Sequence, residues 1–258
     1  MNPGSDNISG GSGSGVSLAA LRESFASLYA SLENMREIEG PELHTRYVAL
    51  FGEENLTLFS LAVEATELRS LVRLVQASAP LDDAAKERIR REAKASTAPY
   101  RRRMELRSME YIVSDMAGCA VKRRDELLLS LLKRASVMVF ATNIPRPVAR
   151  GLFGRLETLF SNRDVEGMRS LVEELKAESA ACVRDDDNER RERASLEKAI
   201  AITRAEIDEL NMTYPYIMRS RLAEKSWIRL EHERLQREIA NLRLKLDELS
   251  ARVRELGF

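Results

Sequence analysis

The chain is poor in the residue types that build disulfide frameworks, metal centres and β-sandwiches. Its 258 residues include two cysteines and two histidines, and aromatic residues make up only 5%. Cys119 and Cys182 are too few for a disulfide framework and indicate a reducing compartment. Neither has a Cys or His at zinc-ligand spacing, and neither His44 nor His232 has an acidic residue in the spacing of helical di-metal sites. We therefore expect no metal and no cofactor.

An excess of charge of one sign is also missing, because 41 basic and 41 acidic residues cancel. No global field therefore draws the chain to nucleic acid or to an anionic membrane. Residues 1–15 are rich in Gly and Ser, without the basic and apolar regions of a signal peptide, and are expected to form a flexible tail. The most apolar window, Leu127 to Ala141, is too short to span a bilayer. We expect a cytoplasmic protein without membrane contact.

The chain is rich in charged residues and in apolar residues at helical spacing. Charged residues make up 32%, which is typical of a long-helix protein. The clearest pattern is a heptad repeat near the C-terminus, with β-branched residues at position a and leucines at position d. Its members are Ile228, Leu235, Ile239, Leu242, Leu246, Leu249, Val253 and Leu256. Another helix must cover such a seam, so we predict a coiled-coil interface.

The remaining helical patterns predict the organisation of the chain. A long helix follows Pro41, and an apolar row at 196–210 precedes the turn at Tyr214-Pro215-Tyr216. The rows on either side of this turn predict an antiparallel helical hairpin, and the far end of the longer final helix is expected to pack on the helix from Leu43 to Ser78. We predict an all-α fold of long coiled-coil helices with a small helical bundle inserted between them. The predicted regions are a tail at 1–15, a helical region at 16–121, the bundle at 122–180 and the C-terminal hairpin at 181–258.

No motif in the chain indicates catalysis. Nothing resembles a nucleophile elbow, and long helices seldom provide the strained turn that it needs. His232 falls on the apolar row of the last helix, where a polar side chain at position a specifies the register of packing. We predict that the protein is not an enzyme.

The segment from Lys86 to Arg107 is the strongest electrostatic feature, with nine basic residues against three acidic ones. Tyr100 stands beside Arg101, Arg102 and Arg103, and arginine next to an aromatic residue can grip phosphate and stack on bases. Two interpretations stay open. The segment is either a solvated helix face that pairs with acids elsewhere in the chain or an anion and nucleic-acid contact.

Three stretches carry a resemblance to a known group of proteins: residues 46–53 (RYVALFGE), residues 152–168 and residues 214–227. Their order is similar to that of bacterial helical proteins that carry a J-like domain between coiled-coil arms. In J-domains, a His-Pro-Asp loop between the second and third helices triggers ATP hydrolysis by a heat-shock chaperone. Here the resemblance places the second helix at Asp125 to Arg134 and the third at Val148 to Phe160.

The connection between these two helices, residues 135–143, contains no histidine and no His-Pro-Asp tripeptide. The resemblance therefore implies a degenerate J-like module that binds a partner without stimulating its ATPase. Val137, Met138, Val139 and Phe140 stand in place of the trigger, either as core residues or as a hydrophobic docking surface.

Two functional hypotheses follow. The first is a non-enzymatic interaction or scaffold protein, associated with a chaperone, that binds a protein partner or a second copy of itself through its coiled coil. A parallel dimer and an intramolecular hairpin satisfy the seam equally well. The alternative is a nucleic-acid-binding helical protein that uses residues 86–107.

Overall fold

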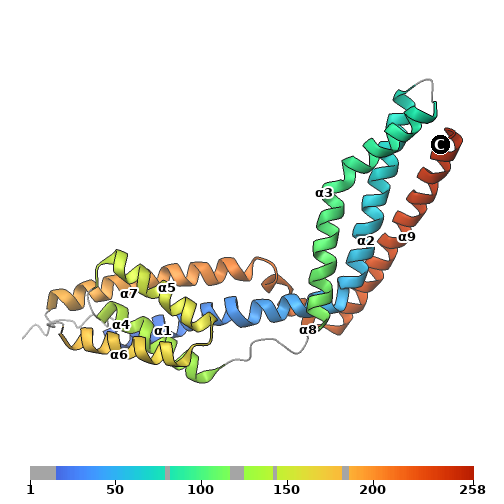
Figure 1. Cartoon of the computed structure of the whole chain (residues 1–258). Coiled ribbons are helices and arrows are strands. Elements are labelled where there is room, and N and C mark those ends of the chain that lie inside the picture. The colour runs from blue at the N-terminus through green and yellow to red at the C-terminus, as the bar shows by residue number, and fades with distance from the viewer. Residues whose placement is uncertain (1–15, 79–81, 117–124, 142–143, 182–185) are drawn as a thin grey trace, which may run out of the picture. The chain divides into compact units, whose positions relative to one another are not determined.

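The computed structural model describes residues 16–78, 82–116, 125–141, 144–181 and 186–258. Within these ranges every regular element is a helix and none is a strand, which confirms the predicted all-α class (Figure 1). The chain divides into two compact units. The first comprises Met1–Ile38 and Arg123–Met212, and the second comprises Glu39–Lys122 and Thr213–Phe258. The regions predicted at 16–121 and 181–258 are thus each divided between the two units.

Among the described residues, the first unit is built from five helices. These are α1 (Leu18–Asn34), α4 (Glu126–Ala141), α5 (Arg146–Ser161), α6 (Val165–Ala181) and α7 (Asp186–Asn211). α4 packs on α1, α5 and α6, while α1 also packs on α7. Leucines from four of these helices are almost or fully inaccessible in the common core: Leu128, Leu132, Leu156, Leu171, Leu175 and Leu196. Burial of these apolar side chains holds the five helices together.

Short polar side chains set the N-termini of three of these helices. Ser17 caps α1, and its Oγ accepts a hydrogen bond of 3.1 Å from a backbone N–H of the first turn. Asp125 Oδ1 accepts one of 3.0 Å at the start of α4, and Asp164 Oδ1 accepts one of 2.8 Å at the start of α6. Each side chain satisfies a donor that has no partner within the helix.

The connection predicted at 135–143 differs from the structure, because α4 continues as far as Ala141. Ala135 and Val139 follow Leu128 and Leu132 at helical spacing, and all four side chains are buried. The apolar side of the helix therefore extends well beyond Arg134, where the second helix was predicted to end. A loop here would expose these side chains to water, so burial favours the longer helix.

The second unit contains α2 (Gly40–Ala77), α3 (Asp83–Met116) and α9 (Lys225–Glu255), with a 3-10 turn at Tyr216–Met218 and a short helix α8 (Arg219–Ala223). α2 packs along both α3 and α9. α3 is antiparallel to α2, because Arg107 lies over the Phe59 ring and Arg101 pairs with Glu67. α9 runs in the same direction as α2, as Figure 1 shows, and the two helices begin side by side.

The two C-terminal helices, which were predicted to form a hairpin, belong to different units. α7 packs along α1 in the first unit, and α9 packs along α2 in the second. α7 is parallel to α1, since Arg22 bonds Glu192 and Arg36 bonds Glu206 at the same sequence separation. An apolar row requires a covering helix but does not specify which one, and here the N-terminal helices provide the cover. In the second unit, α2 forms an antiparallel pair with α3 instead.

A π-helical segment, Met35–Glu39, leads from α1 into α2. It ends directly before Gly40 and Pro41, where the sequence indicates a break between helices. Proline has no backbone N–H, so the carbonyl one turn earlier loses its usual hydrogen-bond donor. A wider π-type turn is one way in which a helix accommodates such a loss without a loop.

Packing of α9 on α2 predicts a large cost for truncating the seam. Leu235 is 1% exposed, so Leu235→Ala is expected to lower the free energy of unfolding by about 2–5 kcal/mol through the cavity that it leaves. Leu244 lies on the same helix but is 63% exposed, and Leu244→Ala is expected to change stability by less than about 0.5 kcal/mol. Urea unfolding followed by far-UV circular dichroism measures both. Equal effects of the two substitutions would contradict the packing.

Candidate interaction surfaces

The heptad seam of α9 lies against α2 of the same chain. Leu235, Ile239, Leu246 and Val253 are buried. The other four predicted positions are partly accessible, and they are Ile228, Leu242, Leu249 and Leu256. At the start of the helix, the seam joins the cluster around Phe51, which is fully buried. A helix within the chain therefore supplies the cover that the seam requires.

Two polar residues interrupt the apolar rows of α2 and α9, and the structure brings them together. His232 Nδ1 lies 2.7 Å from Glu54 Oε1. The His232 ring also stands 4.8 Å from the ring of Phe51. Because each polar group meets the other, neither helix buries a polar side chain without a partner. This pairing fits the predicted role of His232 in setting the register of the two helices.

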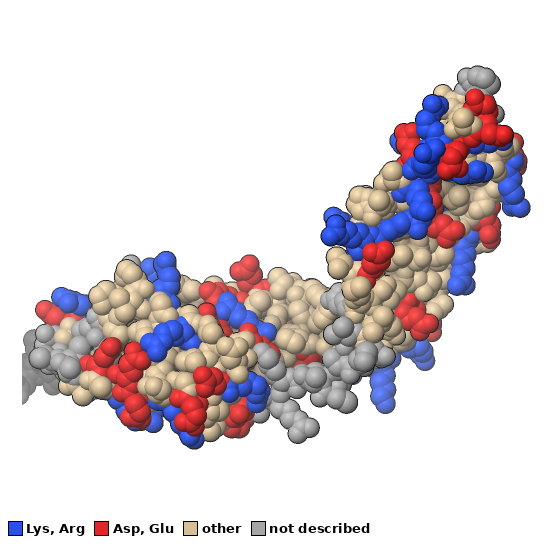
Figure 2. Space-filling model, viewed as in Figure 1, with Lys and Arg blue, Asp and Glu red and all other residues tan. Residues whose placement is uncertain are grey.

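The three predicted arginine contacts on α3 differ in their surroundings. Arg101 pairs with Glu67 of α2, and Thr97 donates a hydrogen bond of 3.1 Å to the same carboxylate. Arg102 and Arg103 are exposed and form no ion pair within the described part of the chain. Figure 2 shows acidic and basic side chains intermingled over the visible face of the second unit. The basic segment is thus partly neutralised rather than one uninterrupted positive stripe.

The four apolar residues of the predicted docking surface lie in the last part of α4 and face two different grooves. Val139 belongs to the buried core, while Val137, Met138 and Phe140 are half-buried and pack against it. Val137 and Met138 line a groove between α1 and α4, which we call the first groove. Val139 and Phe140 line a groove bounded by α1, α5 and α7, which we call the second groove.

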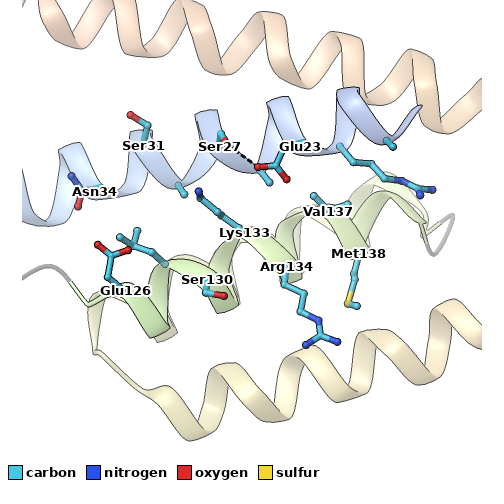
Figure 3. A pocket seen from close by; sticks show the side chains of 15 residues that line it. Glu23, Ser27, Ser31, Asn34, Glu126, Ser130, Lys133, Arg134, Val137 and Met138 are labelled. Atoms are coloured by element: carbon cyan, nitrogen blue, oxygen red, sulfur yellow. Dashed lines mark hydrogen bonds between the residues drawn. The ribbon is translucent and has the colours of Figure 1, made fainter. Parts of the chain in front are cut away.

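The first groove has a volume of ≈ 800 Å³ (Figure 3). Its α1 wall carries small side chains that include Ser27 and Ser31, and Glu23 accepts a hydrogen bond from Ser27. On the α4 wall, Lys133 points towards α1, whereas Arg134 points away from it. The walls hold both charge signs, and polar and apolar atoms line this groove about equally, whereas apolar atoms dominate the second groove.

The second groove is larger, ≈ 1110 Å³, and its floor is aromatic. Phe25 meets Phe140 edge to face at 4.9 Å between ring centroids, and Tyr29 meets Phe153 in the same manner at 5.4 Å. The Tyr29 side chain is 6% exposed, and its hydroxyl has no hydrogen-bond partner in the described structure. The sequence indicated Val139 and Phe140 as a possible docking surface but missed the other rings of this site, because they come from helices whose proximity no local pattern reveals.

A buried carboxylate lies one turn beyond Tyr29. Glu33 is 3% exposed, and burial raises the pKa of its carboxyl to about 7. The Arg36 guanidinium, 3.0 Å from Glu33 Oε1, offsets part of this increase, while Glu157 and Glu37 add to it. Burial also raises the pKa of the Tyr29 phenol, and the charge of Glu33 raises it further.

The remaining sequence predictions concern metal ligands, the two cysteines and membrane spans. Within the described ranges, no three residues among His, Cys, Asp and Glu are grouped so that they would hold a metal ion. Cys119 and Cys182 lie outside those ranges. No described helix combines the length and the apolar character needed to cross a membrane.

Comparison with known proteins yields no match to a family model, to a curated protein or to a solved structure. The similarity to J-domain proteins therefore rests on the three sequence stretches alone and stays a prediction.

The buried Glu33 predicts that stability depends on pH. The folded-state pKa lies above the ordinary value of 4.5, so folding takes up a proton between roughly pH 4.5 and 7. The free energy of unfolding is therefore expected to fall as pH rises through this window, by up to about 3 kcal/mol from this group. Urea unfolding at several pH values measures the fall, and Glu33→Gln should flatten it. Glu23→Gln, at an exposed position of the same helix, should leave it unchanged, and an unaltered pH profile for Glu33→Gln would refute the assignment.

Proposed function

We propose that the protein is a non-enzymatic helical interaction protein whose first unit binds a protein partner. The observation that carries the proposal is the second groove, where aromatic side chains of α1, α4 and α5 line an open space. Phe25 and Tyr29 are buried, whereas Phe140 and Phe153 are partly accessible. Accessible apolar surfaces in a groove mark interaction sites.

The second unit fits a scaffold role. Its long helices cover their own apolar rows, so the α9 seam does not require a second copy of the chain. The partly accessible leucines of that seam lie next to exposed charged side chains, which favours a solvated surface. We therefore assign partner binding to the first unit and a supporting role to α2, α3 and α9.

The J-like resemblance supports a more specific version of this role. It suggests a chaperone-associated factor in the cytoplasm, a location that the scarcity of cysteine also favours. The chain contains no His-Pro-Asp tripeptide, so the imidazole and carboxylate of the trigger are missing. A partner would then be bound without stimulation of its ATPase.

Site-specific photo-crosslinking tests whether the first unit binds a partner. Val148 on α5 is 54% exposed, and Leu244 on α9 is 63% exposed. With a photoreactive amino acid at either position, a host protein should be crosslinked at 148 and not at 244. Adducts at neither position, or equal adducts at both, would contradict the proposal. In the same preparation, the ATPase rate of the host heat-shock chaperone should be unchanged, and a severalfold increase would exclude the degenerate J-like interpretation.

Nucleic-acid binding is a second candidate. It is favoured by Arg102 and Arg103, which are exposed without an ion pair among the described residues and lie beside the accessible ring of Tyr100. The pairing of Arg101 with Glu67 argues against it, because that guanidinium is already engaged.

Binding of a fluorescent single-stranded RNA, measured by anisotropy between about 50 and 200 mM salt, tests this second candidate. If the segment binds RNA, replacing Arg102 and Arg103 by alanine should weaken binding and reduce the salt slope by about two. Replacing Arg243 and Arg252, two exposed arginines of α9, is the matched control and should have little effect. Absence of binding at the lowest salt would discard this candidate.

A further inference from the structure

The second groove is open along one face of α7 from Arg191 to Glu206. Its lining residues on this helix include Arg191, Ser195, Lys198, Ile202 and Glu206. Their spacing of three or four residues places them in a single stripe along the helix axis. At ~1.5 Å per residue the stripe extends for roughly 22 Å, or about four helical turns. This length matches a helix lying alongside α7.

The opposite wall and the floor suit an apolar helix face. α5 contributes Arg150, Phe153 and Glu157, which also share one side of their helix. The floor consists of Phe25, Tyr29 and Phe140. On the α7 wall, Ala194 and Ala199 are small, so another backbone can approach closely. Apolar side chains spaced every three or four residues on a partner helix would reach the rings between the two walls.

The floor of the second groove contains a buried polar group, the hydroxyl of Tyr29. Tyrosine hydroxyl groups in protein interiors normally form a hydrogen bond, and an unsatisfied one is destabilising. Tyr29 lines the second groove, yet its hydroxyl bonds to no described residue. The hydroxyl oxygen has almost no accessible surface, so it marks an incompletely satisfied floor rather than a point of contact for an occupant.

The charges on the walls indicate the chemistry of the occupant. Among the acids that line the groove, Glu192 pairs with Arg22, and Glu206 with Arg36. Three cationic side chains have no ion pair within the described residues, and they are Arg150, Arg191 and Lys198. Glu157 is the one lining acid in the described structure without an ion pair. The free charge of the walls is therefore positive.

We propose that the second groove binds an amphipathic helix of a partner protein, with its apolar face on the aromatic floor and acidic residues beside Arg150, Arg191 and Lys198. This inference rests on the proposed function and names the class of partner. The stripe on α7 favours a helix over a compact small molecule. Its lining residues recur on four successive turns, so a helix lying alongside α7 would contact all of them. Complementary charge on the walls sets the orientation and excludes basic helices.

The test uses the full chain and two synthetic peptides. One is a fluorescein-labelled four-turn helix with leucines on one face and glutamates along both flanks, and the other has lysine in place of each glutamate. Fluorescence anisotropy should show that the acidic peptide binds at least about tenfold more tightly than the basic one, a difference of about 1.4 kcal/mol. Equal binding of the two peptides, or no binding of the acidic one, would overturn the proposal.

Two substitutions on α7 locate the binding site. Ile202 lines the groove and is 48% exposed, so Ile202→Glu should weaken acidic-peptide binding at least about tenfold. Ala201→Glu adds the same charge at an exposed position of α7 that does not line the groove, and should leave binding within about twofold. Lys198→Glu should weaken binding in the same direction at a surface position where folding is not at risk. Equal effects of Ile202→Glu and Ala201→Glu would place the peptide elsewhere.

A small apolar acid is the main competing occupant, and decanoate serves as its probe. Decanoate binding that depends on Ile202, together with failure of the acidic peptide to bind, would overturn the assignment to a helix. The crosslinking experiment tests the proposed function independently of the peptide experiment. Crosslinks at position 148 without peptide binding would keep the interaction role and reject the groove as its site, whereas the absence of both would reject the two proposals together.

Discussion

An apolar helix face in water must be covered, and in both units of this protein N-terminal residues cover C-terminal ones. α7 lies along α1, and α9 lies along α2, each pair running in parallel. The hydrophobic effect is non-directional, so the apolar rows of these helices demand burial without choosing a partner. The choice comes from the polar contacts beside them, such as Arg22 with Glu192 and His232 with Glu54. These contacts match a particular register and would be lost if the helices were shifted.

The polar groups of the first unit show where this coverage is incomplete. Glu33 is buried with a single cationic neighbour in contact, and its carboxyl therefore has a raised pKa. The hydroxyl of Tyr29 has no described partner at all. Burying a poorly paired carboxyl or hydroxyl group destabilises a fold, so apolar residues would be favoured at positions 29 and 33 in a bundle packed on every side. The presence of the two polar groups beside an open aromatic groove is consistent with a surface that is completed by another molecule.

The distribution of charge differs between the basic segment of α3 and the second groove. On α3, acidic residues interrupt the basic segment, and Arg101 is neutralised by Glu67. In the second groove, by contrast, three cations form no ion pair with any described residue and lie beside an apolar floor. In the second groove of this neutral chain, positive charge therefore coincides with an aromatic floor. That coincidence, more than total charge, distinguishes the first unit as the candidate interaction module.

The amino-acid sequence by itself determined the helical class and the positions of the α9 seam. Helical period is a local property, so the spacing of the leucines of α9 reports it directly. It also indicated that α9 would meet the long helix after Pro41. Only the tertiary structure decided that α7 packs on α1, that α4 continues through the apolar residues 137–140, and that an aromatic groove lies between α5 and α7. The physical reason is that an apolar row specifies a need for burial, whereas the identity of its partner depends on which faces remain uncovered after all the helices have packed.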